Sequence, residues 1–191
     1  MKAVTPRQGT MSAAKTLTSE SMVYKNLDTN TNMYKKDKDG RITREGYEEK
    51  LNQAVATTAD SILLKETYKD TNGNVVETQA SKDSRELFMA TSKLAYLNGV
   101  GNSGLSGPRM DLNLTEETEM KRDAQIALDN ARAKWKESHP TATNDDLWAL
   151  EHLAVDYSIY GAQSSDNQIN TANSFSMADR IGTARTFLSK E

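Results

Sequence analysis

The sequence contains no cysteine and only 2 histidines among its 191 residues. The lack of cysteine excludes disulfide bonds, thiolate nucleophiles and cysteine-ligated zinc or iron–sulfur centres. Two histidines are too few for a histidine-rich metal site. Hydrophobic residues make up 36% of the chain, below the roughly 45–50% of average globular domains, a norm that also counts glycine. This composition indicates a thin core or a part of the chain that stays unpacked.

Long apolar runs and a strong net charge are also missing. No stretch approaches the roughly 20 apolar residues of a membrane span, and the N-terminal segment lacks the apolar region of a cleavable secretion signal. The formal net charge of -3 argues against broad electrostatic binding to nucleic acid or to an anionic membrane. We therefore expect a soluble protein that binds neither, located in the cytoplasm or exported without a cleavable signal peptide.

Apolar residues recur at intervals of three and four over most of the chain, which is the spacing of one helix face. Strand signals are poor and are confined to 41–43 and 74–78. The pattern predicts an all-α helical bundle with at most a tiny two-stranded element. The apolar stripes of the predicted helices run over 43–68, 87–97, 120–135, 147–160 and 177–188.

Polar residues mark the predicted helix ends. Asn113 with Glu116 three residues later is a capping-box signature. Ser138-His139-Pro140 ends the same helix, with His139 as a C-terminal cap, and Thr143 opens the next helix. A cap at Ser84 or Asp83 is expected for the 87–97 helix. The acidic residues of the helix that follows Asn113 favour its N-terminal dipole; they are Glu116, Glu117, Glu119 and Asp123.

Composition sets two segments apart from the rest of the chain. Residues 1–20 are rich in Ser, Thr, Ala and Lys and predict a flexible arm. The glycine-rich stretch 98–108 is either a linker between domains or a mobile loop within one domain. We favour a single helical domain over 21–191, because 21–98 and 109–191 each hold few large apolar residues.

One stretch suggests metal chemistry. Asp37-Lys-Asp39-Gly40-Arg41-Ile42-Thr43 resembles the EF-hand calcium loop, which needs alternating oxygen ligands, a glycine at position 6 and a bidentate Glu at position 12. With Gly40 at position 6, Asp37 and Asp39 fall at positions 3 and 5, and the Arg41 carbonyl falls at position 7. The resemblance implies a calcium site in the half 21–98.

The same register places Lys35 at position 1 and Gly46 at position 12, and neither side chain supplies an oxygen. Two other registers are open. The loop can start at Asp28 and carry an insertion, or it can start at Asp37 and end at Glu48.

A second stretch with the same pattern lies downstream. With Gly73 at position 6, Asp70 and Asn72 occupy positions 3 and 5 and Val75 occupies position 8. EF-hands work in pairs, so the resemblance implies a short β contact between Ile42 and Val75. The implied calcium ligands are Asp37, Asp39, the Arg41 carbonyl and Glu48 in the first loop and Asp70, Asn72 and Asn74 in the second.

Turn chemistry alone explains the same residues. Asp, Asn and Gly tolerate positive φ, and their side chains bond to nearby backbone N–H groups. The two stretches are therefore either degenerate calcium loops of low affinity, about 10⁻⁴–10⁻³ M, or plain turns.

Catalytic arrangements are poorly represented. His152 and Asp156 have the spacing of an i,i+4 pair, which can orient an imidazole, but no suitable nucleophile accompanies them. Residues 99–104 match GxGxxG, yet they follow a helix instead of a strand, which is the wrong context for a phosphate loop. Trp135 and Trp148 predict an aromatic core between consecutive helices or, alternatively, a face for a partner.

The sequence therefore predicts a non-enzymatic calcium-binding or EF-hand-like protein-interaction module whose partner is another protein. The alternative is a metal-free component of a different class: a bacterial secretion substrate such as a secreted effector, or a phage-encoded structural or interaction protein. An enzyme that uses His152 is the third hypothesis. The oligomeric state is left open.

Overall fold

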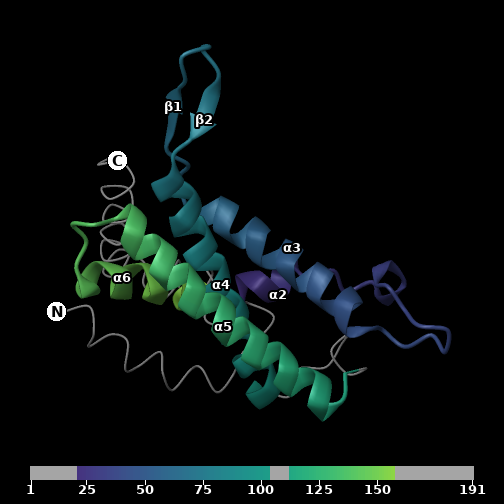
Figure 1. Cartoon of the computed structure of the whole chain (residues 1–191). Coiled ribbons are helices and arrows are strands. Elements are labelled where there is room, and N and C mark those ends of the chain that lie inside the picture. The colour runs from purple at the N-terminus through teal and green to yellow at the C-terminus, as the bar shows by residue number, and fades with distance from the viewer. Residues whose placement is uncertain (1–20, 104–111, 158–191) are drawn as a thin grey trace, which may run out of the picture.

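The computed structural model describes residues 21–103 and 112–157, with only the backbone described at 99–103. These residues form a helical body with one small antiparallel sheet of two strands (Figure 1). The predicted all-α fold with a tiny two-stranded element is confirmed. The predicted arm at 1–20 and the predicted helix at 177–188 lie outside the described residues. The elements are α2 (Met22–Asn26), η2 (Thr31–Met33), α3 (Arg44–Ile62), β1 (Thr67–Lys69), β2 (Val75–Glu77), α4 (Gln79–Ser103), α5 (Leu114–Ser138) and α6 (Asn144–Val155).

Side-chain caps fix the helix starts. The Glu116 N–H donates to Asn113 Oδ1 over 2.8 Å, and the Glu116 carboxylate accepts from the Asn113 N–H, so the predicted capping box is confirmed. Thr143 and Asp146 form a second capping box at the start of α6. At the start of α3 the Thr43 hydroxyl accepts from the Gly46 N–H, and glycine has no side chain to return the bond. These side chains satisfy N–H groups that have no partner within the helix.

Helix α5 ends as predicted, with His139 as its C-cap. Helix α4 starts earlier than predicted, at Gln79, because the Thr78 hydroxyl accepts from the Ser81 N–H and serves as the cap. Ser84, one of the two expected caps, is buried and its hydroxyl accepts from the Trp135 indole N–H.

Two further boundaries differ from the prediction. Helix α3 ends at Ile62 instead of continuing to position 68, since the chain turns there into β1. Helix α4 continues to Ser103, so the loop predicted at 98–108 is wrong over its first residues. Positions 104–108 lie outside the described residues.

The predicted strand at 74–78 corresponds to β2, which pairs with β1 in the register Thr67–Glu77, Tyr68–Val76 and Lys69–Val75. Strand β1 was not predicted, because the helix expected over 43–68 covers its first two residues. The stretch 41–43 forms only a single bridge, between Ile42 and Lys36.

Apolar side chains gather in two clusters, and both combine residues from before and after the 104–111 segment. Burial of each large side chain contributes about 1.5–3 kcal/mol. The first core cluster is Val23, Leu27, Tyr34, Ile42, Tyr47, Leu51, Ala54, Val55, Tyr96, Leu97, Met120 and Ala124. The second core cluster is Ala59, Leu87, Phe88, Leu128, Ala131, Trp135, Leu150, Leu153, Ala154 and Tyr157.

The two tryptophans differ in burial. Trp135 is 2% exposed and belongs to the second core cluster, as predicted for an aromatic core. Trp148 is half-buried, and its ring stacks on His152 with 3.7 Å between the ring centroids. Within 21–103 and 112–157, no helix combines the length and the apolar character needed to cross a membrane.

Candidate functional site

The first predicted loop folds as a tight hairpin, defined here as the first hairpin (Lys36–Ile42). Asp37 Oδ1 accepts from the Asp39 N–H at 2.9 Å and from the Arg41 N–H at 3.0 Å. The Asp37 N–H donates to the Arg41 carbonyl at 2.9 Å, and the Gly40 N–H donates to the Asp37 carbonyl at 3.0 Å. Gly40 has a φ of 81°, which favours glycine because a Cβ clashes in this region.

The second predicted loop has the same geometry and is defined as the second hairpin (Thr67–Glu77). Asp70 Oδ1 accepts from the N–H groups of Asn72 and Asn74, both at 2.9 Å. The Asp70 N–H donates to the Asn74 carbonyl at 2.9 Å, and Gly73 again has a φ of 81°. The shared Asp-x-Asp/Asn-Gly-x pattern therefore produces one turn twice.

Several of the proposed ligands already accept hydrogen bonds within these turns. The first Asp of each turn accepts two backbone N–H groups through one oxygen, and the carbonyl of Arg41 accepts from the Asp37 N–H. The backbone bonds, above all that from the Asn74 N–H, hold the pKa of Asp70 below its ordinary value. Among the described residues, no group of three or more His, Cys, Asp or Glu side chains is placed to hold a metal ion.

Glu48 lies apart from the first turn, on α3. Its carboxylate binds the Arg44 guanidinium and the Lys93 ammonium, each at 2.9 Å. Burial acts to raise the pKa of Glu48, but Lys93 and Arg44 together outweigh it and lower the pKa. The structure therefore brings Asp37, Asp39 and the Arg41 carbonyl together but gives Glu48 a different role.

The two hairpins lie at opposite ends of α3 (Figure 1). At 1.5 Å per residue, the 19 residues of α3 span about 28 Å. Ile42 bridges to Lys36, and Val75 pairs with Lys69, so each hairpin pairs with itself. The predicted β contact between Ile42 and Val75 is wrong, and the two sets of proposed ligands lie apart.

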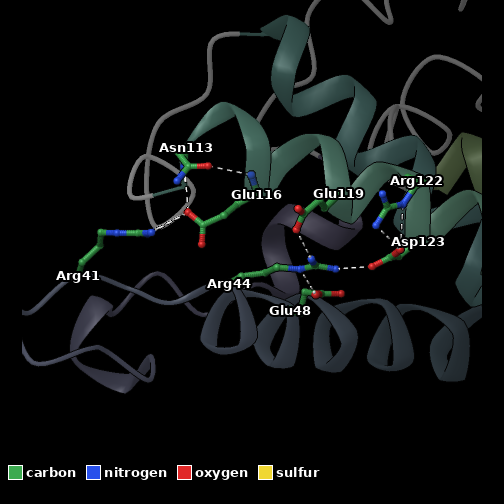
Figure 2. Close-up of polar contacts among 8 residues, drawn as sticks. All are labelled: Arg41, Arg44, Glu48, Asn113, Glu116, Glu119, Arg122 and Asp123. Atoms are coloured by element: carbon green, nitrogen blue, oxygen red, sulfur yellow. Dashed lines mark hydrogen bonds and ion pairs between the residues drawn. The ribbon is translucent and has the colours of Figure 1, made fainter.

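The first hairpin is docked on the helices. Ile42 is 2% exposed in the first core cluster. A Cβ at Gly46 would lie 2.4 Å from the Lys35 carbonyl oxygen, so only glycine allows α3 to approach the hairpin this closely. The Arg41 guanidinium donates to Glu116 Oε1 at 2.6 Å and 3.1 Å, and this oxygen also serves the capping box of α5 (Figure 2).

Arg44 continues the same contact between α3 and α5. Its guanidinium reaches Glu119 at 3.1 Å and Asp123 at 2.5 Å, besides Glu48 on its own helix (Figure 2). The hydrogen bond from Arg44 lowers the pKa of Asp123 and raises the pKa of Arg44 itself. We interpreted Glu116, Glu119 and Asp123 from the sequence as dipole partners of α5. The signal that we missed is the helical spacing of Glu119 and Asp123, which matches one face.

The second hairpin is anchored to α4 at its base. The Arg85 guanidinium binds both oxygens of Glu77 at 2.8 Å and 2.9 Å, and the Ser81 hydroxyl donates to Glu77 at 2.7 Å. The Ser81 hydroxyl also accepts from the Glu66 N–H. Burial acts to raise the pKa of Glu77, but Ser81 and Arg85 outweigh it and lower the pKa.

Beyond this base, the second hairpin projects away from the helices (Figure 1). Tyr68 is 52% exposed and Val75 is 68% exposed, and Leu64 beside the base is 48% exposed. Tyr68 lies opposite Val76, whereas Val75 lies opposite Lys69. Because side chains alternate along a strand, the hairpin presents an apolar residue on each of its two faces.

Each of the two histidines forms a hydrogen bond through its ring Nδ1 to a backbone carbonyl of its own helix. His152 Nδ1 bonds to the Trp148 carbonyl at 2.9 Å, and His139 Nδ1 bonds to the Trp135 carbonyl at 2.8 Å. The Asp156 N–H donates to the His152 carbonyl.

Comparisons with protein-family models, with curated proteins and with solved structures found no match to this chain. The case for a function therefore depends on the geometry of the two hairpins.

Proposed function

We propose that the chain is a non-enzymatic protein-interaction module and that the second hairpin is its contact element. The observation that carries this proposal is the exposure of Tyr68 and Val75 on a hairpin that projects from the helical body (Figure 1). Tyrosine is among the residues that contribute most of the binding free energy in protein interfaces when a partner covers them, and an exposed valine adds apolar area that a partner can bury. Nothing in the described fold covers these two residues.

The anchored base supports the proposal. Charge-assisted bidentate hydrogen bonds such as Arg85–Glu77 are among the strongest in proteins. They hold the hairpin in one orientation on α4, so a partner does not have to order it. Such preorganisation lowers the entropic cost of binding.

Photo-cross-linking tests this function. The photoreactive residue p-benzoylphenylalanine is placed at position 68 and, as the matched control, at Ile126 on α5, which is equally exposed at 52%. In the cells that produce the protein, we expect a discrete cross-linked partner from position 68 and none from position 126. Excess wild-type protein should compete for that partner, and a variant with Tyr68→Ser and Val75→Ser should not. The absence of cross-links from position 68, or equal cross-linking from both positions, would contradict the proposal.

Calcium binding by the two turns is a second proposal, and the repetition of one Asp-based turn at both positions favours it. The candidate ligands are Asp37, Asp39 and the Arg41 carbonyl in the first hairpin, with Glu48 on α3, and Asp70, Asn72 and Asn74 in the second hairpin. Since Asp37, Asp70 and the Arg41 carbonyl also accept hydrogen bonds within the turns and Glu48 is held by Arg44 and Lys93, we expect weak affinity, about 10⁻⁴–10⁻³ M.

Calorimetric titration of chelator-treated protein with Ca²⁺ tests the second proposal. The matched control carries Asp37→Asn and Asp70→Asn, because Asn keeps the oxygen that accepts the backbone N–H groups and loses the charge. Saturable heat that disappears in this variant supports calcium binding. Equal heat in both proteins, or none up to millimolar Ca²⁺, argues against it.

A further inference from the structure

The hydrogen-bond register shows which groups of the second hairpin face outward. The Thr78 N–H donates to the Glu66 carbonyl, and the Asp70 N–H donates to the Asn74 carbonyl. In an antiparallel pair, hydrogen-bonded and non-hydrogen-bonded residue pairs alternate. Tyr68–Val76 is therefore a hydrogen-bonded pair, and Lys69–Val75 and Thr67–Glu77 are not.

Residues of the non-hydrogen-bonded pairs direct their N–H and C=O groups away from the partner strand. On β2 these residues are Val75 and Glu77. The sheet of the described residues has only two strands, so the far side of β2 is an open edge. An open edge is complementary to one kind of occupant, an extended peptide backbone.

The two edges of the hairpin differ in charge. The β1 edge carries Lys69, and lysine on an edge strand is a feature that discourages strand pairing. On the β2 edge, Val75 is uncharged and 68% exposed, and the carboxylate of Glu77 is neutralised by Arg85. The β2 edge is therefore the one that accepts another strand without leaving an unpaired charge beside it.

A second copy of this chain fits the edge poorly. Self-pairing of β2 about Val76 would place Val75 opposite Glu77 of the other copy, so Val75 would gain no apolar partner. Self-pairing about Val75 would place Glu77 opposite Gly73, whose φ of 81° lies outside the strand conformation. Each chain also carries a net charge of -3, which opposes association of two copies. A strand from another protein avoids both costs if it places an apolar residue opposite Val75 and no acidic residue opposite Glu77.

We propose that the partner binds by strand addition: an extended segment of another protein pairs with the β2 edge and covers Val75 with a β-branched or aromatic residue. This inference rests on the proposed function and adds the mode of binding. A three-residue strand offers few backbone groups, so the affinity of an isolated segment is low and side-chain contacts determine its specificity.

Proline substitutions measure how much the backbone N–H groups of each edge contribute to peptide binding. Val75→Pro removes an N–H that points away from β1, and proline is tolerated on edge strands at such positions. Lys69→Pro makes the matched change on the β1 edge. Val75→Thr keeps the N–H and removes the apolar character. An NMR contact between Tyr68 and Val76 in each variant shows that the hairpin itself is intact.

The probe is a library of random linear peptides selected on the full-length wild-type chain. We expect the selected peptides to bind the Lys69→Pro variant as they bind the wild type. They should bind the Val75→Pro variant about tenfold more weakly, because the outward N–H of residue 75 is lost and the peptide carbonyl opposite it is left without a donor. Nuclear Overhauser contacts between the peptide backbone and Val75 should show an extended peptide. The Val75→Thr variant should bind with an intermediate loss.

Other outcomes overturn strand addition. These are the selection of no peptides, equal binding to the wild type and the Val75→Pro variant, or equal losses from both proline variants. Self-association that Val75→Pro abolishes would assign the edge to a second copy and would also overturn the proposal. Cross-linking from position 68 distinguishes the two levels: if it succeeds while Val75→Pro has no effect, the hairpin binds its partner through a face and only strand addition fails.

Discussion

The first and second hairpins share a turn but not an environment. In each turn an Asp accepts two backbone N–H groups, and the glycine has a φ of 81°. Yet the residue after the turn is 2% exposed at Ile42 and 68% exposed at Val75. Local sequence therefore determines the turn, whereas residues outside the turn determine whether the hairpin joins the core.

Those outside residues differ in kind between the two hairpins. The first hairpin contacts α3 through the close approach of Gly46 and contacts α5 through Arg41 and Glu116. Within the described part of the chain, the second hairpin is anchored at short range, through Glu77 with Arg85 and Ser81. A hairpin held by distant parts of the chain becomes part of the core, and one held by its own neighbours remains available to a partner.

The largest expected effect comes from truncating the residue that follows each turn. Ile42→Ala removes a buried side chain from the first core cluster and should lower the free energy of unfolding by about 2–5 kcal/mol. Val75→Ala at the equivalent position of the second hairpin should change it by no more than about 0.5 kcal/mol. Urea denaturation of both variants measures the difference. Equal losses would show that the two hairpins are embedded alike.

The next effect is expected at the contact between the first hairpin and α3. Gly46→Ala forces a Cβ toward the Lys35 carbonyl oxygen, now 2.4 Å from that position, and should destabilise the protein by about 1–3 kcal/mol. Asn52→Ala, at an exposed site on the same helix, is the control and should be neutral or slightly stabilising. A neutral Gly46→Ala variant would mean that the hairpin is not packed tightly on α3.

The ion pairs of Glu48 on α3 predict that the free energy of unfolding depends on pH. Because the folded-state pKa of Glu48 is lowered, its contribution to stability is complete above the ordinary value of 4.5 and disappears as pH falls through the folded-state pKa. Glu48→Gln should therefore cost about 1–2 kcal/mol at neutral pH, between exposed and buried ion pairs. The cost should vanish in acid.

Glu49→Gln is the matched control for this prediction, because Glu49 pairs with the well-exposed Lys35. It should cost less than about 0.5 kcal/mol at either pH. Denaturation of the wild type and both variants at several pH values provides the test. A Glu48→Gln cost that stays constant with pH would rule out a role for the carboxylate charge.

The smallest effect, and the sharpest comparison, comes from the two turn glycines. Gly40→Ala and Gly73→Ala impose the same strain of about 1–2 kcal/mol, since both residues have a φ of 81° and open space around the Cβ position. Gly40→Ala should lower global stability by this amount. Gly73→Ala should mainly speed amide exchange within the second hairpin, which can open without unfolding the helices. Equal global losses would contradict the independence of the second hairpin.

The sequence predicted the features that depend on near neighbours. The capping box of Asn113 and Glu116, the His139 C-cap and the strand at β2 all depend on residues close in the chain, and all three are confirmed. The two Asp-Gly stretches were correctly recognised as equivalent, because the backbone of each turn is set by its own side chains.

What the sequence could not supply depends on distant residues. The Arg41–Glu116 and Arg44–Glu119 pairs each join residues that are 75 positions apart, and no local pattern selects these partners among the 27 acidic residues. The burial of a residue also depends on distant parts of the chain. Ile42 and Val75 follow the same turn, but Ile42 is buried because α3 and α5 pack against the first hairpin. The continuation of α4 through 99–103 was missed because its glycines are typical of loops.

The sequence separation of these anchors also determines the order in which the two hairpins complete their contacts as the chain emerges from the ribosome. The Glu77–Arg85 pair spans 8 positions, so the second hairpin can reach its final form soon after α4 begins to appear. The first hairpin is synthesised earlier but cannot complete its contacts until α5 is synthesised, because the partner of Arg41 is Glu116 on that helix. During translation at about 5–20 residues per second, the older hairpin therefore stays unfinished for several seconds while the younger one is already complete.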